Sequence, residues 1–137
     1  MAAFLDTNVL VYAFDRRDER KRATARALLA DASAKWTISS QVLSEFFWVV
    51  TCKLSPTVPE SVAEGAVDLL AAQMNVVAVD APLVTGAVEV ARSHKLALWD
   101  AQLLAAAGRA NCVTILTEDL GRGEVLAGVT VVDPFRG

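Results

Sequence analysis

Four acidic residues stand in segments whose apolar neighbours make a free carboxylate unfavourable. They are Asp6 in FLDTNVLVYAFD, Glu45 in QVLSEFFWVV, Asp100 in KLALWDAQLLAAA and Asp119 in TEDLGRG. An ionised carboxylate on a core-facing surface is costly unless a cation or hydrogen-bond donors meet it, and these partners must come from elsewhere in the fold. Oxygen donors without a supporting histidine or thiolate cluster indicate a hard cation such as Mg²⁺ or Mn²⁺, and they disfavour zinc.

Three of these acids also have a purely structural interpretation. Asp6, or Asn8 two residues later, suits the cap of a following helix, and Asp100 suits the N-cap of its own helix. Asp119 suits an Asx turn before the glycines. Glu45 has no such alternative, because it lies in the middle of an expected helix where capping is not available. A functional interpretation is therefore favoured for Glu45 above the others.

The histidine and the cysteines do not indicate a second chemical centre. His94 is the single histidine of the chain, and we expect it at an exposed helix end rather than in acid and base work. Cys52 and Cys112 are 60 positions apart without CxxC spacing. This spacing favours two reduced thiols, with one long-range disulfide as the alternative. Motifs of the GxxxxGK[ST] and GxGxxG types do not occur, which excludes the common nucleotide-binding loops.

Basic residues are concentrated in one short segment, although the net charge of the chain is −3. Six of the thirteen lie in RRDERKRATAR, namely Arg16, Arg17, Arg20, Lys21, Arg22 and Arg26. Two interpretations stay open: a solvated helix face paired with Asp18 and Glu19, or a patch that contacts phosphate groups. The negative net charge disfavours a protein that binds nucleic acid over its whole surface.

Hydrophobic periodicity predicts strands that alternate with helices. The expected strands cover residues 2–6, 35–39, 75–79, 112–116 and 129–133. The expected helices cover residues 18–33, 41–53, 60–73, 82–94 and 99–110. The strands are continuously apolar rather than alternating, which is typical of a mainly parallel sheet covered on both faces. The predicted fold class is therefore α/β, a three-layer α/β/α sandwich with about five strands.

This architecture determines where chemistry is expected. In an open parallel sheet the ligand crevice lies beyond the carboxyl ends of the strands. Asp6 and Asn8 follow the first expected strand, and Thr117, Glu118 and Asp119 follow the fourth. We therefore expect these two groups of polar residues to meet at one edge of the sheet.

Length and composition predict one domain over residues 1–137. The chain has 137 residues, of which 54% are hydrophobic, enough for one core but not for two. No apolar run reaches the roughly 18 residues of a membrane helix, and the start of the sequence lacks a signal-peptide pattern. We expect a soluble, cytoplasmic protein with no membrane association.

Four blocks of sequence together resemble a known family. LDTNVLVYA, SSQVLSEFFWV, LALWDAQLLAAA and ILTEDLGRGEVLAGVTVVDPF, in this order and spacing, resemble a PIN-domain ribonuclease of the VapC toxin type. The resemblance covers essentially the whole chain. It implies a PIN-like α/β/α fold, Mg²⁺- or Mn²⁺-dependent endoribonuclease activity, a cognate VapB-type antitoxin and a homodimer.

The resemblance also implies roles for individual residues. Asp6, Glu45, Asp100 and Asp119 are expected to be the catalytic, metal-binding acids, with Asn8 and Thr117 positioning them. The sequence leaves open whether Glu118 or Asp119 faces the metal, and the motif favours Asp119. Metal-activated water would then hydrolyse single-stranded or looped RNA. The basic segment becomes a candidate RNA guide, with Arg16, Arg17, Arg20, Lys21 and Arg22 as possible RNA contacts.

Two other function classes compete with the nuclease. A haloacid-dehalogenase-like phosphohydrolase also begins with an aspartate after its first strand, but it needs a second aspartate where this chain has Asn8. A non-enzymatic, acidic metal-binding α/β module is the other alternative. A receiver-like version would use Asp80 after the third expected strand, yet it lacks the paired acids near the start.

Overall fold

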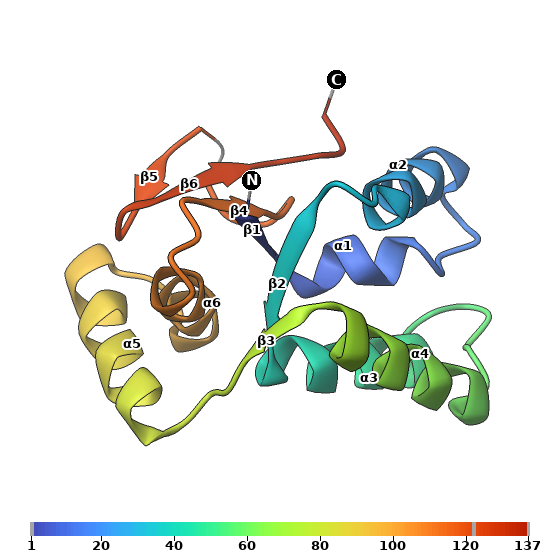
Figure 1. The fold of residues 1–137 in the computed structure, drawn as a ribbon, viewed down its shortest axis with the longest axis horizontal. Helices are drawn as coiled ribbons and strands as arrows, with labels where there is room; N and C mark the ends of the chain where they lie inside the picture. Colours follow the sequence, from blue (N-terminus) through green and yellow to red (C-terminus); the bar gives the residue numbers. More distant parts are fainter. Residues whose placement is uncertain (1, 122, 137) are drawn as a thin grey trace.

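A central sheet organises the structure, a computed structural model that describes residues 2–121 and 123–136 (Figure 1). Within these residues the sheet has six strands in the order β3-β2-β1-β4-β6-β5. The strands are β1 (Ala2–Leu5), β2 (Lys35–Ser39), β3 (Asn75–Val77), β4 (Thr114–Leu116), β5 (Val125–Leu126) and β6 (Val129–Val132). All neighbours pair in parallel except β5, which runs antiparallel to β6. The predicted mainly parallel sheet is confirmed.

The prediction of about five strands missed β5. Leu126 pairs with Val129, so only Ala127 and Gly128 connect β5 to β6. Both residues have positive φ, 51° for Ala127 and 83° for Gly128, which is the conformation that a two-residue hairpin needs. The sequence signal is weak because an alanine rarely occupies this conformation and because a two-residue strand has no detectable periodicity.

Helices cover both faces of the sheet, as the predicted three-layer arrangement requires. They are α1 (Thr7–Tyr12), α2 (Glu19–Ala30), α3 (Ser40–Cys52), α4 (Glu60–Gln73), α5 (Ala81–His94) and α6 (Leu98–Arg109). Figure 1 shows α1 to α4 on one side of the strands and α5 with α6 on the other. Helix α1 was not predicted, because its six residues lie within one apolar run. None of the helices in the described residues is long and apolar enough to cross a membrane.

The inner strands explain why the sheet needs cover on both faces. Successive side chains of a strand point to opposite faces, yet Phe4 and Leu5 in β1 are both fully buried. Phe46 of α3 and Leu104 of α6 belong to the same apolar core. The continuous apolar pattern of the strands therefore reflects burial from two sides.

The two cysteines are free thiols. Cys52 is exposed at the end of α3, and Cys112 is buried before β4. The alternative of a long-range disulfide is therefore wrong. His94 lies exposed at the last position of α5, as expected.

Candidate active site

The order of the strands creates a crevice between β1 and β4. From β1 the chain goes first to β2 and β3 on one side and only later to β4 on the other. Such a reversal of strand order is where open parallel sheets bind ligands. Leu5 pairs with Leu116, so Asp6 and Thr117 leave the sheet together, and the Asp6 amide donates to the Leu116 carbonyl at 3.0 Å.

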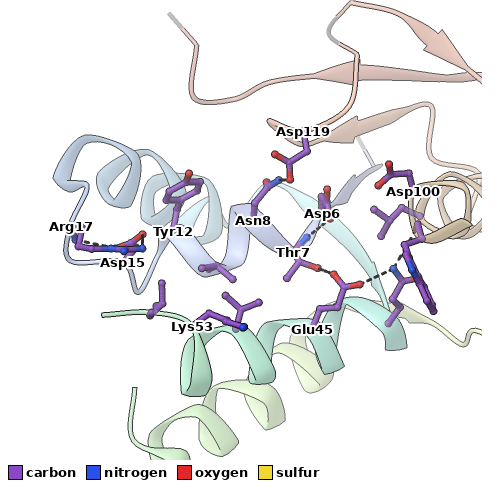
Figure 2. A pocket seen from close by; sticks show the side chains of 16 residues that line it. Asp6, Thr7, Asn8, Tyr12, Asp15, Arg17, Glu45, Lys53, Asp100 and Asp119 are labelled. Atoms are coloured by element: carbon purple, nitrogen blue, oxygen red, sulfur yellow. Dashed lines mark hydrogen bonds and ion pairs between the residues drawn. The ribbon is translucent and has the colours of Figure 1, made fainter. Parts of the chain in front are cut away.

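One pocket of about 380 Å³ at this edge is lined by all four predicted acids. Asp6 follows β1, Glu45 lies on α3, Asp100 lies in the first turn of α6, and Asp119 lies in the loop after β4. Figure 2 shows these four carboxylates around the opening between the elements that carry them. Four segments that are distant in sequence thus place their acids in one cavity.

Asp6 is the most buried of these acids and the most strongly perturbed. Its Oδ2 accepts a hydrogen bond from Thr117 Oγ1 at 2.7 Å, and its Oδ1 accepts from the Thr7 amide at 2.6 Å. Burial raises the pKa of Asp6 to about 6; the two hydrogen bonds oppose this rise, and the carboxylates of Asp119 and Glu45 add to it. Asp6 is also the N-cap of α1, so the capping interpretation holds beside its place in the pocket.

Glu45 is held at both carboxylate oxygens by neutral donors. Thr7 Oγ1 donates to Oε2 at 3.0 Å, and Gln41 Nε2 donates to Oε1 at 3.0 Å. The side chain is half-buried on the face of α3 that turns toward the pocket. Hydrogen-bond donors from α1 and α3 therefore stabilise the Glu45 carboxylate, which the apolar residues around it cannot do.

Asp100 is not an N-cap, and that structural interpretation is wrong. The N-cap of α6 is Ala97, and no side chain caps this helix. Asp100 is the third residue of the helix, within its first turn, because Leu98 and Trp99 already belong to α6. Burial raises the pKa of Asp100, and the neighbouring carboxylates of Asp119 and Glu45 raise it further.

The loop after β4 turns Asp119 and Glu118 in different directions. Asp119 lines the pocket, where its Oδ2 accepts from Asn8 Nδ2 at 3.0 Å. Glu118 accepts from Tyr12 OH at 2.5 Å and from Lys21 Nζ at 2.8 Å. Because these partners occupy both oxygens of Glu118, it is Asp119 that faces the other acids.

Asn8 and Thr117 contact the acids that they were expected to position. Thr117 is fully buried; its hydroxyl donates to Asp6 and accepts from the Asp119 amide at 3.1 Å. Asn8 Nδ2 lies 3.3 Å from Thr117 Oγ1 as well as bonding Asp119. The Oδ1 atom of Asn8 is buried without a hydrogen-bond partner in the described part of the chain. That orphaned acceptor lies beside the pocket.

Most of the basic segment bonds to the protein itself. Lys21 binds Glu118, Arg22 binds Glu19, Arg20 donates to the Phe135 carbonyl and Arg26 donates to the Ala13 carbonyl. Arg17 differs, because it lines the pocket while pairing with Asp15 at 3.2 Å. Contact with RNA stays a prediction for this segment, and position singles out Arg17.

Several residues that line the pocket were not predicted from the sequence. Thr7, Gln41, Lys53 and Trp99 all line it, and Trp99 is 62% exposed. One of them had a detectable signal: Gln41 lies four residues before Glu45 and therefore shares its helix face. Trp99 had none, because its exposure depends on how α6 meets α3.

The donor set fits a hard divalent cation in its chemistry. Five carboxylates line the pocket: the four predicted acids and Asp15, which pairs with Arg17. Repulsion from Asp119 and Glu45 contributes to the raised pKa values of Asp6 and Asp100. Carboxylate oxygens are the ligands that Mg²⁺ and Mn²⁺ prefer. In the described residues, however, no three His, Cys, Asp or Glu side chains converge into a ready-made metal centre. The residues needed are present, and their side chains are not gathered into a coordination shell.

The fold and the pocket define an α/β protein with an acidic site at the switch point of a mainly parallel sheet. The chain belongs to the PIN-domain family, whose sequence model matches residues 3–122. The match includes all four predicted acids, and it confirms the family resemblance inferred from the sequence motifs. No curated protein sequence matches the chain significantly.

Several solved structures of toxins share the fold. A toxin–antitoxin complex from Klebsiella pneumoniae matches with 22% identity and a TM-score of 0.68, covering 96% of this chain and 97% of that one. VapC20 from Mycobacterium tuberculosis, a sarcin–ricin loop cleaving toxin, matches with 20% identity and a TM-score of 0.66, covering 82% and 86%. VapBC2 from Rickettsia felis, bound to a promoter DNA fragment, matches with 18% identity and a TM-score of 0.65, covering 96% and 97%. At these identities the likeness establishes the fold.

Proposed function

We propose that this chain is a Mg²⁺- or Mn²⁺-dependent endoribonuclease, the toxin of a type II toxin–antitoxin system, that hydrolyses single-stranded or looped RNA. The observation that carries the proposal is the convergence of Asp6, Glu45, Asp100 and Asp119 in one pocket. Perturbed carboxyl groups in a cleft are typical of functional sites. Membership of the PIN family and the similar fold of a toxin that cleaves the sarcin–ricin loop support the same function.

The protein's own residues hold the acids ready for a cation. Thr117 and the Thr7 amide fix the orientation of Asp6, while the Thr7 hydroxyl fixes Glu45. When bound, a divalent cation supplies activation of a water molecule and neutralisation of phosphate charge. Asp119 is exposed and Asp100 half-buried, so both have room to turn toward the cation. Coordination would then relieve the repulsion among the four carboxylates.

Basic and aromatic residues at the rim of the pocket suit an RNA strand. Figure 2 shows Arg17 and Lys53 on the side of the pocket away from Asp100. These two basic side chains would attract the phosphate groups on one side of the bond that is cut. The exposed indole of Trp99, beside Asp100, offers a surface on which an unpaired base stacks. Splayed strands enter such a pocket more readily than a duplex does.

A VapB-type antitoxin is the partner that we propose for this toxin in the cytoplasm, and a second copy of the chain is the expected homodimer. Similar folds occur in complexes with antitoxins.

The binding surface that we propose for the antitoxin is an apolar pocket of about 310 Å³ between α2 and α4. It includes Leu69, which is 56% exposed. Leu69→Glu should weaken binding of a tagged VapB-type antitoxin from the same genome, whereas Val88→Glu on α5 should not. Sedimentation velocity tests the dimer.

Cleavage of a defined RNA oligonucleotide tests the catalytic proposal. Wild-type protein should cut it with Mg²⁺ or Mn²⁺ and should stop in EDTA. Asp100→Asn and Glu45→Gln should each lose at least a hundredfold in rate while circular dichroism stays native. The matched controls Asp68→Asn and Glu64→Gln change exposed acids on α4 and should retain full activity.

The same experiment separates the alternatives. A folded Asp100→Asn variant with full activity would remove the acidic pocket from catalysis. The PIN family match favours the nuclease over the haloacid-dehalogenase interpretation, and hydrolysis of p-nitrophenyl phosphate without RNA cleavage would contradict the nuclease. Asp80 caps α5 and pairs with Arg109, so it serves structure rather than a receiver-like site. Mn²⁺ binding without any cleavage would indicate a non-enzymatic metal-binding module.

A further inference from the structure

A chain of hydrogen bonds connects the interior of α6 to Glu45. Gln102 Nε2 donates to Gln41 Oε1 at 2.7 Å, and Gln41 Nε2 donates to Glu45 Oε1 at 3.0 Å. Gln41 Nε2 also lies 3.4 Å from the Trp99 carbonyl oxygen. Gln102 is polar but only 5% exposed, and its buried neighbours on the helix are apolar. A buried carboxamide is costly unless its hydrogen bonds are made, so its presence here calls for a reason.

The Glu45 carboxylate determines the direction in which these hydrogen bonds are donated. A carboxylate accepts hydrogen bonds but does not donate them, so Gln41 must present its amide nitrogen to Glu45. Its carbonyl oxygen then faces Gln102, which must in turn present its own amide nitrogen. The Trp99 carbonyl enforces the same orientation, because it too accepts from the Gln41 nitrogen. Each bond polarises the next one in the same direction.

We propose that Gln41 and Gln102 are positioning residues that hold the Glu45 carboxylate for the cation and water of the proposed nuclease reaction. This role rests on the proposed function. Gln41 and Thr7 each hold one oxygen of Glu45, which fixes the plane of the carboxylate as well as its place. Gln102 keeps the Gln41 amide from turning its oxygen toward Glu45.

The hydrogen-bond chain from Gln102 through Gln41 to Glu45, called the relay below, also connects two acids of the pocket, Glu45 and Asp100. Gln41 lies four residues before Glu45 on α3, and Gln102 lies two residues after Asp100 on α6. The bond between the two glutamines therefore ties together the helices that carry these carboxylates. Hydrogen-bond partners of metal-binding carboxylates typically change metal affinity or activity by about 10–100-fold when they are removed. We expect an effect of that size from the loss of Gln41.

The decisive variants separate positioning from packing. Gln41→Met keeps a side chain of similar length at a half-buried position but lacks the amide, and Gln102→Leu removes the buried donor. Gln73→Met is the control, because Gln73 is exposed at the end of α4. Two measurements are made on each purified protein: the Mn²⁺ concentration that gives half of the melting-temperature increase, and kcat and KM for an RNA oligonucleotide.

A role through Glu45 predicts a specific pattern. Gln41→Met should raise the half-saturating Mn²⁺ concentration about tenfold or more and should lower kcat, with little change in KM. Glu45→Gln combined with Gln41→Met should match Glu45→Gln alone, because Gln41 has no carboxylate left to position. Gln102→Leu should change in the same direction as Gln41→Met, and Gln73→Met should behave as wild type.

Defined outcomes would overturn the proposal. A folded Gln41→Met variant whose Mn²⁺ half-saturation stays within twofold of wild type would do so, whether or not Gln102→Leu folds. A further loss in the double variant would show that Gln41 acts independently of Glu45, and a wild type without any Mn²⁺ response would also overturn the relay. The two proposals fail separately: Gln41-dependent Mn²⁺ binding without RNA cleavage would refute the nuclease but keep the relay. RNA cleavage with Gln41→Met unaffected would refute the relay alone.

Discussion

The Thr117 hydroxyl donates a hydrogen bond of 2.7 Å to the Asp6 carboxylate, across 111 positions of sequence. Both residues directly follow neighbouring strands, β1 and β4, so the bond lies at the carboxyl ends of these two strands. It stabilises the charged form of Asp6, whereas burial and the other acids of the pocket favour the protonated form. Asp6 therefore links the stability of the fold to pH.

The first prediction is that the metal-free protein loses stability as pH rises from about 4 to about 6. Asp6 has its pKa raised from 3.8 to about 6, so in this range the folded protein binds more protons there than the unfolded chain does. The contribution is fully present below the lower pKa and is lost as pH rises through the upper one. Its ceiling is about 3 kcal/mol, since one pKa unit corresponds to roughly 1.4 kcal/mol. Urea denaturation in EDTA measures it, and Asp6→Asn should lack this pH dependence.

A second prediction concerns metal and thermal stability. Mn²⁺ should raise the melting temperature of the wild type, because a ligand at a hundredfold excess over its Kd stabilises the folded state by about 2.7 kcal/mol. Asp6→Asn should melt at the same or a higher temperature in EDTA, since it removes repulsion and asparagine still caps a helix. Its increase with Mn²⁺ should be smaller. A lower melting temperature in EDTA with an unchanged Mn²⁺ increase would show that Asp6 is only a cap.

The third prediction assigns the RNA backbone contacts to Lys53 and Arg17. Each contact removed should raise the KM for RNA several-fold and reduce the salt dependence of binding by about 0.7 per phosphate for single strands. Lys53→Met and Arg17→Met test this, with kcat expected to change little. Lys35→Met is the matched control, because Lys35 is exposed at the start of β2, at the opposite edge of the sheet from the pocket. Equal salt slopes for Lys53→Met and Lys35→Met would contradict the assignment.

A fourth prediction treats Lys21 as a structural residue. Its hydrogen bonds with Glu118 and Tyr12 hold the pKa of Lys21 above its usual range, so it stays charged across the pH range of assays. Lys21→Met should lower the free energy of unfolding by about 1 kcal/mol, because it breaks the tie between α2 and the loop after β4. The salt slope for RNA should stay at the wild-type value. A reduced slope with unchanged stability would instead return Lys21 to the predicted RNA patch.

The elements that sequence analysis predicted well are those with a strong local signal. The stretch AAFL around Phe4 is a continuous apolar run, and such runs identify buried parallel strands. Strand β5 and helix α1 escaped prediction because each is too short to show a period. The basic segment was located correctly, but its charges are mostly engaged by partners such as Phe135 and Ala13, which no local pattern reveals.

The sequence by itself determined the α/β class and the PIN family, because the order of the motifs is specific. It also indicated the four acids that line the pocket, because an acid in an apolar segment is visible locally. Only the tertiary structure decided which side chains surround those acids. Glu118 points away from the other acids because its hydrogen-bond partners are Tyr12 of α1 and Lys21 of α2. Gln41 contacts Gln102 only because α3 and α6 approach each other at the edge of the sheet. Orientation and pKa depend on contacts between distant segments. A linear pattern holds no information about these until the chain has folded.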